Sequence, residues 1–368
     1  MKITILTSSR ADYGILRPLI VELSSNSNFE VSLVAFGTHI SSLHGNTITE
    51  IEADGIEVSE KIDTLVSGSG PRSISEGIGY TYKKFAKYWD TVETDLIVCL
   101  GDRFEMFAAV GASVPFNIPV AHVSGGEVTT GAIDNVYRNS LTLMSKYHFA
   151  STEIYKENIE KLVGKKENIY NVGALNYDNL MTMEYYSKDE LNEHFDINPQ
   201  KKTCLITFHP ETVSYENNKN HIHELVLALG ELNEYQQVIT MPNADTNGNL
   251  IREKLIEYSQ NTKNEVVLIE SLGWKGYLST MKHCEFMLGN TSSSFVEASF
   301  FQKKVINIGE RQNGRLLTDN IFCCKIEKKE ILNQVFLIEK MEPFNKIDMY
   351  GNGNTSNKIV KILSNIKQ

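Results

Sequence analysis

The sequence is poor in the features that mark membrane-bound or metal-binding chains. It has five cysteines in 368 residues, and none of them shows CxxC or Cys/His metal spacing. No segment approaches the ~18 apolar residues of a membrane span, and the N-terminal "MKITILTSSRADYG" turns polar after one short apolar run. We therefore expect a cytoplasmic protein without a membrane partner, whose cysteines are reduced core residues.

Two nucleotide-binding fingerprints are also missing. There is no GxxxxGK[ST] sequence, and no GxGxxG follows the first expected strand, so triphosphate hydrolysis and hydride transfer lose support. Basic residues are in deficit, because 36 Lys and Arg stand against 46 Asp and Glu, which gives a net charge of −10. This balance argues against a nucleic-acid partner, whereas a small anionic ligand is compatible with it if arginines cluster locally.

What the sequence does contain is a regular alternation of short apolar runs and helix-length amphipathic segments. This alternation predicts an α/β fold with parallel sheets covered by helices on both faces. The length and the apolar content of 41% predict two domains. The strand-like runs form two series, which are "ITIL", "VSLVAF", "DLIVCL", "IPVAHV", "YHFA" and "IYNV", then "CLITF", "QQVITM", "EVVLI", "CEFML" and "KVINI".

The two series predict two Rossmann-like domains with a central cleft as the binding site. We place the first at residues 1–174 and the second at 175–352, and expect an amphipathic helix in 353–368 to pack back across their junction. Gly and Ser dominate residues 65–77, which predicts a flexible loop. A plain solvated connection and closure of Arg72 over an anion are both compatible with that composition.

Carboxylates follow two strands that should be neighbours in the first sheet. Asp102 comes after "DLIVCL", and Glu127 and Asp134 come after "IPVAHV". In open parallel sheets the carboxyl ends of the strands line the ligand crevice, so these groups should meet there. Closely placed carboxylates are suited to acid and base catalysis. The alternative for each is a helix N-cap or an ion pair with Arg103 or Arg138.

The second half offers groups for an anion. In "FMLGNTSSSFVEA", Asn290, Thr291 and Ser292 stand between a strand and a helix, which suits a diphosphate site or an ordinary N-cap. Glu297 is in reach of a ribose, or is a surface residue. Arg311 and Arg315 in "GERQNGR" could hold phosphate oxygens or form structural ion pairs.

Two further strand ends carry candidate cationic groups. Arg10 follows the first strand, and His209 follows the first strand of the second series in "TFHPE". A protonated His209 could assist the departure of a phosphate, and the alternative is a hydrogen-bonded loop histidine. Among the nine histidines, only His122 is comparably placed.

Seven sequence blocks, taken together, resemble a known family. "SSRADYG", "GDRFE", "HVSGGE…ID…R", "FHPE", "MPNAD", "GNTSSSFVE" and "GERQNGR" occur in order between residues 8 and 315. As a set they resemble the hydrolysing UDP-N-acetylglucosamine 2-epimerases, bacterial enzymes that open sialic acid biosynthesis. The resemblance implies two Rossmann-like domains like those of the B-type glycosyltransferases. It also implies conversion of UDP-GlcNAc and water into N-acetylmannosamine and UDP through a glycal, with no cofactor and no metal.

The resemblance also assigns roles to individual positions. Asp102, Glu127 and Asp134 would remove and return the proton at C2, and His209 would stabilise the departing UDP. The residues implied to hold the nucleotide are Arg10, Arg103, Asn243, Thr291, Ser292, Glu297 and Arg311; Asn290 and Arg315 join this set from the motif reasoning above. Many relatives carry Glu at the position of Ser124. Of the three carboxylate roles, the one assigned to Glu127 is weakened by this difference.

Three alternatives share this fold expectation. A UDP-2,4-diacetamido-2,4,6-trideoxyhexose in legionaminic acid synthesis could replace UDP-GlcNAc as the substrate, since no motif reports on C4 and C6 of the sugar. A glycosyltransferase or a nucleotide-sugar sensor would leave the three carboxylates without a shared purpose. The family's habit suggests a homodimer or homotetramer.

Overall fold

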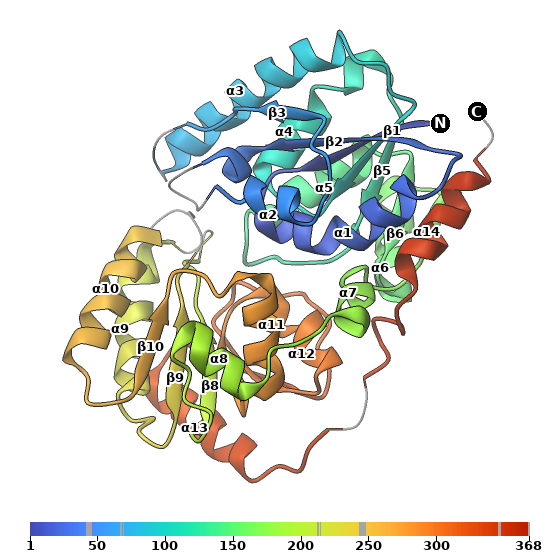
Figure 1. Ribbon diagram of the computed structural model, residues 1–368. Helices are drawn as coiled ribbons and strands as arrows, with labels where there is room; N and C mark the ends of the chain where they lie inside the picture. The colour runs from blue at the N-terminus through green and yellow to red at the C-terminus, as the bar shows by residue number, and fades with distance from the viewer. Residues whose placement is uncertain are drawn as a thin grey trace. The chain divides into compact units, whose positions relative to one another are not determined.

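The structure is a computed structural model that describes residues 1–41, 46–66, 68, 70–211, 213, 215–242, 248–344 and 347–366. Its chain divides into two compact units (Figure 1). Unit 1 comprises Met1–Glu127, Asp134–Thr182 and Asp348–Gln368, and unit 2 comprises Val128–Ile133 and Met183–Ile347. Each unit is built on one parallel sheet, so the predicted α/β fold of two Rossmann-like domains is confirmed.

Unit 1 contains a seven-stranded sheet with the strand order β3-β2-β1-β4-β5-β6-β7. Its strands are β1 (Lys2–Thr7), β2 (Glu30–Phe36), β3 (Glu60–Ile62), β4 (Leu96–Leu100), β5 (Val120–Val123), β6 (Tyr147–Ala150) and β7 (Ile169–Asn171). The helices and 3-10 turns are α1 (Arg10–Ser24), η1 (Gly37–Ile40), α2 (Ile48–Ala53), α3 (Pro71–Trp89), α4 (Phe104–Gly111), η3 (Val114–Phe116), α5 (Asp134–Met144), α6 (Glu153–Val163), α7 (Asn176–Thr182) and α14 (Thr355–Ser364).

Unit 2 contains a six-stranded sheet with the order β10-β9-β8-β11-β12-β13. Its strands are β8 (Thr203–Thr207), β9 (Gln236–Thr240), β10 (Val266–Ile269), β11 (Phe286–Gly289), β12 (Lys304–Ile308) and β13 (Ile321–Cys324). The helices and turns are α8 (Lys188–Phe195), η4 (Tyr215–Asn217), α9 (Asn218–Leu229), α10 (Gly248–Asn261), α11 (Gly273–His283), η5 (Ser292–Ser294), α12 (Val296–Phe300) and α13 (Lys328–Glu339).

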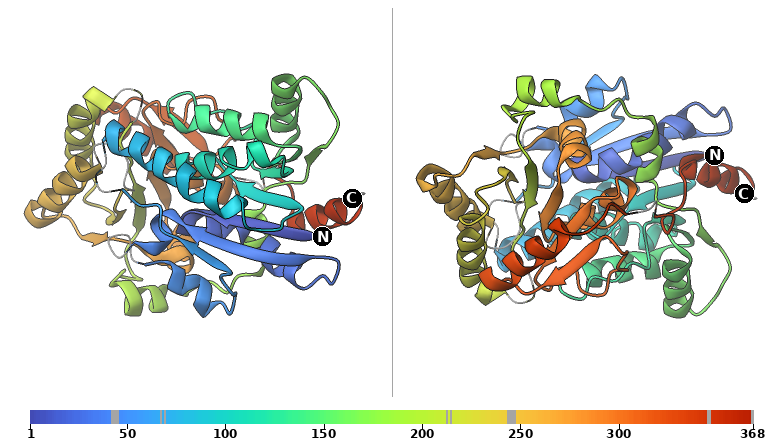
Figure 2. Two further views of the ribbon diagram at one scale, coloured as in Figure 1. Left: turned by 90° about the horizontal axis from the view of Figure 1, so that it is seen from above. Right: turned by 90° about the horizontal axis from the view of Figure 1, so that it is seen from below.

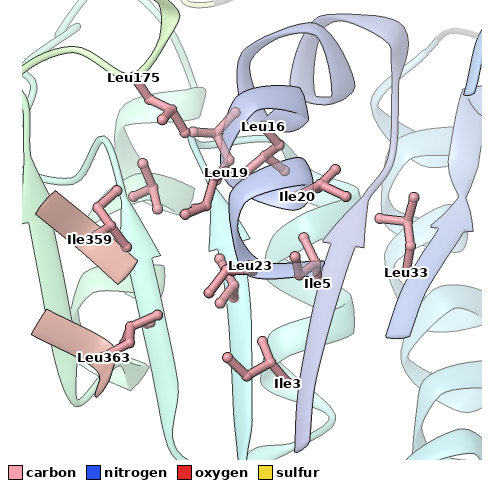
Figure 3. Close-up of a cluster of buried hydrophobic side chains, with 14 of the residues drawn as sticks. Ile3, Ile5, Leu16, Leu19, Ile20, Leu23, Leu33, Leu175, Ile359 and Leu363 are labelled. Atoms are coloured by element: carbon pink, nitrogen blue, oxygen red, sulfur yellow. The ribbon is translucent and has the colours of Figure 1, made fainter. Parts of the chain in front are cut away.

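The side-chain alternation of the strands explains why helices cover both faces of the first sheet. Ile3 and Ile5 of β1 point to one face, where they pack with α1 and α14 (Figure 3). Leu6, Val34 and Cys99 point to the other face and pack with α3, α4 and α5. Because both faces are buried, the central strands read as continuous apolar runs. Figure 2 shows these helical layers from two further sides.

Helix α7 belongs to unit 1. This segment of the unit therefore ends at Thr182, eight residues beyond the boundary predicted at 174. The Asn179 side chain donates to the Gly14 carbonyl at 2.5 Å. The Asp178 carboxylate caps α14 by accepting from the Thr355 and Ser356 backbone N–H groups at 2.8 and 2.6 Å, and from the Ser356 hydroxyl at 2.6 Å. The C-terminal helix therefore returns to unit 1, where it packs on α1 and α7 (Figure 1).

Replacing Asp178 by Ala is expected to lower the free energy of unfolding by about 2 to 4 kcal/mol. The variant leaves two buried N–H groups of α14 without an acceptor, and a buried unsatisfied donor costs ~1–3 kcal/mol. Urea unfolding gives the stability, and hydrogen exchange should be faster in α14 than in α1. Asp189→Ala on α8 is the control, because Asp189 is exposed. Unchanged exchange in α14 would contradict the capping role.

The interpretation of residues 65–77 as a loop is wrong from residue 71 onward. Pro71 stands at the start of α3, where its fixed φ and missing N–H suit the first helical turn. Arg72 pairs with Glu76 one turn later at 2.8 Å, and its side chain is 89% exposed. Residues 67 and 69 lie outside the described residues. The Gly and Ser content therefore marked only the segment before the helix.

Candidate functional site

In each sheet the order of the strands reverses at one place. We take the residues at these switch points as the candidate site. In unit 1 the reversal lies between β1 and β4, and in unit 2 it lies between β8 and β11. Ligands of open parallel sheets bind outside the carboxyl ends of strands at such a switch point. Arg10 and Asp102 follow the two strands in unit 1, and His209 and Asn290 follow the two strands in unit 2.

The turn after β1 is ordered by a buried carboxylate. Asp12 accepts from the backbone N–H groups of Ser8 and Ser9 at 2.8 and 3.1 Å, and from their hydroxyls at 2.6 and 2.5 Å. This capping box begins α1 at Arg10. Burial raises the pKa of Glu50 on α2, and the positive charge of Arg10 opposes that rise. The capping box thus fixes the backbone at Arg10, the first helical residue after β1.

After β4 the structure brings Asp102 onto a buried arginine. Arg138 of α5 donates through Nη2 to Asp102 Oδ2, and the exposed fractions of the two side chains are 2% and 26%. The same guanidinium donates through Nη1 to the Glu127 main-chain oxygen at 3.1 Å. Arg138 therefore links the ends of β4 and β5. Because this second contact is to the Glu127 backbone, the meeting of the Asp102 and Glu127 carboxylates stays a prediction.

A second ion pair stands beside the first. Arg103 is the N-cap residue of α4 and contacts Glu105 at 2.9 Å. The repulsion expected between neighbouring carboxylates is thus countered by one arginine at each of Asp102 and Glu105. Asp134 is the first residue of α5, one helical turn before Arg138. The alternative reading of Asp102, an ion pair with Arg138, is present in the structure and is compatible with a catalytic role.

The loop after β5 approaches helix α6 too closely for a side chain. Gly126 has φ +78°, and a Cβ at this position would overlap the Tyr155 carbonyl oxygen. Asn158 Nδ2 donates to the Gly126 oxygen at 3.0 Å. Ser124, before the two glycines, also has a left-handed backbone with φ 63°, which a non-glycine residue rarely adopts. These constraints place Glu127, which is 9% exposed, at the end of a tightly held turn.

His122 is a neutral, buried member of this cluster. Its Nε2 lies 2.8 Å from the Gly101 carbonyl oxygen and its Nδ1 lies 3.1 Å from the Thr142 hydroxyl. Burial lowers the pKa of His122 to about 4, and the charge of Arg138 acts in the same direction. A neutral ring donating from Nε2 satisfies the Gly101 carbonyl directly before Asp102. His122 therefore orients the Asp102 turn from inside the sheet.

In unit 2 the side chain of Asn290 is committed to the backbone of His209. Asn290 Oδ1 accepts from the His209 N–H at 2.7 Å, and Nδ2 donates to the His209 oxygen at 2.8 Å. The Asn290 main-chain oxygen accepts from Arg311 Nη1 at 3.3 Å and from Gln312 Nε2 at 2.8 Å. The amide of Asn290 thus holds the His209 backbone in place, and the predicted contact of Asn290 with the substrate stays a prediction.

The turn after β11 carries the predicted hydroxyls. Thr291 precedes the 3-10 turn η5, Ser292 is exposed at its start, and the turn leads into the short helix α12 with Glu297. Gly289 at the strand end has φ +150°, and a Cβ there would overlap the Thr207 carbonyl oxygen of β8. The neighbouring strand therefore requires glycine where the chain enters this turn.

The loop after β12 is held by a buried carboxylate that the sequence reasoning did not select. Glu211 Oε1 accepts from the Glu310 N–H at 2.7 Å. Further along the loop, Arg315 donates to Gln312 Oε1 at 2.6 Å, and its guanidinium lies 5.6 Å from the centre of the Phe295 ring. Glu211 and Gln312 thus fix the backbone that carries Arg311 and Arg315.

Residues Val128–Ile133 pack on this same loop as part of unit 2. The Thr130 N–H and hydroxyl donate to the Asn313 oxygen at 2.8 and 3.2 Å. Gly131 lies so close that a Cβ would overlap the Glu310 carbonyl oxygen. This short segment lies between Glu127 and Asp134 in the sequence.

Replacing Gly131 by Ala is expected to destabilise the protein by about 1 to 3 kcal/mol, the usual cost of overpacking. The methyl group must push residues 128–133 away from Glu310, which weakens the Thr130 hydrogen bonds. Turnover should fall as well, because Glu127 and Asp134 flank the displaced segment. Thermal unfolding and a turnover assay measure both effects. Gly79→Ala is the matched control, since a Cβ at Gly79 meets no atom within 4 Å; equal stability of the two variants would refute the close approach.

One predicted nucleotide-binding residue, Asn243, is not placed by the structure. Asn243 lies outside the described residues, so the structure places neither its backbone nor its side chain. The sequence reasoning named Arg138 only as an alternative ion-pair partner of the carboxylates, and it gave no role to Glu211 or Gln312. A bridging role of Arg138 had a signal, because Arg138 lies four residues after Asp134 and so on the same helix face. Gln312 had none, since its side chain donates to the main-chain oxygen of Asn290, a distant residue in the sequence.

The described residues contain neither a membrane-spanning helix nor a side-chain cluster suited to a metal ion. No helix there is both long and apolar enough to cross a bilayer. No group of three or more His, Cys, Asp or Glu side chains suitable for a metal ion was found in the same ranges. Three cysteines are buried as expected, whereas Cys323 is exposed because it lies on the edge strand β13.

Comparison with known proteins covers nearly the whole chain. The profile described as UDP-N-acetylglucosamine 2-epimerase matches residues 21–364. A GDP/UDP-N,N'-diacetylbacillosamine 2-epimerase (hydrolyzing) of Campylobacter jejuni is 35% identical over 93% of this chain and 87% of that protein. A UDP-N,N'-diacetylbacillosamine 2-epimerase (hydrolyzing) of Legionella pneumophila is 32% identical over 99% and 96% of the two chains.

A solved structure gives the same result for the fold. The UDP-GlcNAc 2-epimerase of Neisseria meningitidis, bound to UDP-GlcNAc, superposes with a TM-score of 0.84 at 19% identity and covers 100% of both chains. The family model and the two relatives confirm the resemblance that the sequence blocks carried. From its profile match and its two relatives above 30% identity, the chain belongs to the UDP-N-acetylglucosamine 2-epimerase family.

Proposed function

We propose that the protein is a hydrolysing 2-epimerase that converts UDP-GlcNAc and water into N-acetylmannosamine and UDP. The observation that carries this proposal is the contact of one buried arginine, Arg138, with the Asp102 carboxylate and with the Glu127 main-chain oxygen in a chain of this family. A reaction that removes a proton from C2 and returns one needs positioned carboxyl groups, and a shared partner for the Asp102 side chain and the Glu127 backbone supports such a role for both residues.

The first step is an elimination. One of the three carboxylates, Asp102, Glu127 or Asp134, takes the proton from C2, and the C2–H electron pair forms the C1–C2 double bond. The bond between C1 and the diphosphate oxygen breaks, and UDP leaves with its electrons. His209 and Arg311 counter the negative charge that develops on the diphosphate. Asn290 supports this step by holding the His209 backbone.

The second step is a hydration. The oxygen of water forms a bond to C1 of the glycal, and a carboxyl group delivers a proton to C2 from the face opposite to the one that lost it. The proton released by the water restores the acid, and the base passes the proton that it took from C2 to solvent, so both groups end in their starting states. The inverted C2 centre gives N-acetylmannosamine. Two faces of one carbon require two differently placed acidic groups, which is why more than one carboxyl is proposed.

The nucleotide is proposed to bind through Arg10, Arg103, Asn243, Thr291, Ser292, Glu297, Arg311 and Arg315. Glu297 would accept from the ribose hydroxyls, and the arginines and hydroxyls would contact the diphosphate. The rigid backbone around Arg311, held by Asn290, Gln312 and Glu211, supports this assignment. A pre-ordered donor set contributes more to anion binding than a mobile one.

A second candidate substrate is a UDP-2,4-diacetamido-2,4,6-trideoxyhexose. The observation that favours it is the name of the Campylobacter and Legionella relatives, which are 2-epimerases of N,N'-diacetylbacillosamine nucleotides. The two substrates differ at C4 and C6 of the sugar, and the reaction at C1 and C2 is the same for both.

One experiment tests the proposal and separates the two substrates. Purified protein is incubated in D2O with UDP-GlcNAc or with the diacetamido sugar nucleotide, and the products are followed by NMR. Release of UDP with N-acetylmannosamine deuterated at C2 supports the first proposal. Consumption of the diacetamido substrate alone transfers the proposal to the second substrate. Intact nucleotide in both reactions would overturn the proposed activity.

A further inference from the structure

A chain of hydroxyl groups runs from the turn after β11 into the second sheet. Tyr277 Oη of α11 lies 2.7 Å from Ser293 Oγ, and Ser293 Oγ lies 3.2 Å from Thr291 Oγ1. On its other side Tyr277 Oη lies 3.4 Å from Thr207 Oγ1 of β8, which lies 2.8 Å from Thr240 Oγ1 of β9. Thr207 and Thr240 are buried, so the inner end of the chain is fixed by the sheet.

Each hydroxyl in this chain of groups has one proton to donate, so the hydrogen bonds must run in one direction, either inward to the sheet or outward to the turn. Burial raises the pKa of Tyr277 to about 12, which keeps its phenol protonated at neutral pH. In the inward order every hydroxyl donates toward Thr240, which donates to the Ile206 carbonyl at 3.4 Å. In the outward order Tyr277 donates to Ser293, and the Ser293 proton is then available to a ligand.

We infer that Tyr277 is a positioning residue that orients the Ser293 hydroxyl as a donor to the diphosphate of the bound nucleotide. This inference rests on the proposed function, in which the turn after β11 holds UDP. An anion accepts hydrogen bonds and donates none, so its binding selects the outward order. A donating phenol also polarises the Ser293 hydroxyl and strengthens its hydrogen bond to the ligand.

Tyr277 is suited to this task by its place on α11. Its phenol bridges the turn to β8, whose residue Thr207 pairs in register with Gly289 at the end of β11. Strand β8 therefore holds the turn after β11 at two points, at Gly289 through strand pairing and at Ser293 through Tyr277. Removal of the phenol oxygen leaves Ser293 with Thr291 as its remaining hydroxyl neighbour in the described contacts, and nothing then sets the donor order.

Calorimetric titration of UDP and of uridine into wild-type protein and Tyr277→Phe tests the inference. We expect the UDP affinity of the variant to fall about tenfold, the scale of one hydrogen bond to a charged group, and the uridine affinity to stay within about twofold. In steady-state assays KM should rise while kcat changes by less than about threefold. Tyr258→Phe is the matched control, because Tyr258 Oη donates to Gln237 Oε1 at 2.9 Å in the same unit.

A second variant keeps the test decisive if Tyr277→Phe folds poorly. Ser293→Ala should also lower the UDP affinity, and the two substitutions together should lower it no further than one alone, since they act through one contact. Equal ratios of UDP to uridine affinity in wild type and Tyr277→Phe, or full additivity in the double variant, would overturn the role of Tyr277 and leave the proposed activity intact. A wild-type protein that binds no UDP would overturn the proposed function and the inference with it.

Discussion

Replacing Asp102 by Asn is expected to lower turnover by at least about 10²-fold, the usual loss on removing a positioned acid or base, while UDP still binds. Asn keeps the shape of Asp and an oxygen that accepts from Arg138, but it can neither take a proton from C2 nor return one. The buried guanidinium also loses its counter-charge, so we expect a loss of about 1 to 3 kcal/mol in stability as well.

The matched control is Asp95→Asn, which lies just before the other end of β4. Asp95 accepts from the Lys2 N–H at 2.7 Å and takes no part in the proposed chemistry. Turnover is measured with UDP-GlcNAc by product release, and binding by titration with UDP. Turnover of Asp102→Asn equal to that of Asp95→Asn would remove Asp102 from the mechanism. Loss of UDP binding together with turnover would instead assign Asp102 to substrate binding.

The protein is expected to lose about 4 kcal/mol of stability between pH 7.5 and pH 5 from two buried histidines, about 2 kcal/mol from each. Burial lowers the pKa of His122 to about 4 and that of His148 to about 3, and the two residues pair in register on β5 and β6. In the unfolded chain both histidines take up a proton near pH 6.5. Their neutral state thus stabilises the fold above that pH, and this contribution is lost as the pH falls toward 4.

Chemical unfolding at a series of pH values measures this effect. His148→Leu should remove about half of the acid sensitivity, and it should cost little at neutral pH because neither ring nitrogen of His148 has a hydrogen-bond partner among the described residues. His223→Ala, at an exposed position, should leave the pH dependence unchanged. An unaltered acid loss in His148→Leu would show that other groups dominate the acid sensitivity.

The sequence was informative where one local pattern decides the structure. Long apolar runs such as "VSLVAF" and "DLIVCL" predicted central strands, because strands buried on both faces need side chains that are apolar throughout. Two of the edge strands, β3 and β13, were not predicted. β3 has three residues and two of them are charged, so it shows no apolar run. β13 is an apolar run of four residues that the sequence reasoning did not select.

The candidate site was predictable as a set of strand ends and less so as a set of contacts. Arg10, Asp102, His209 and Asn290 follow the strands at the two switch points, as their positions in the motifs indicated. Their hydrogen-bond partners were not predicted. The Asn290 amide holds the His209 backbone, 81 residues away in the sequence, and the two residues belong to separate motifs that do not report the contact.

The sequence alone therefore determined the fold class, the family and the strand ends at which polar groups gather, because each follows from short-range patterns and ordered motifs. Only the tertiary structure decided that Arg138 bridges Asp102 and Glu127, that Gly131 packs against Glu310, and that Tyr277 joins Ser293 to the sheet. The reason is physical: a hydrogen bond or a close backbone approach depends on distances and angles that arise when remote segments pack together, and the order of residues along the chain does not encode them one position at a time.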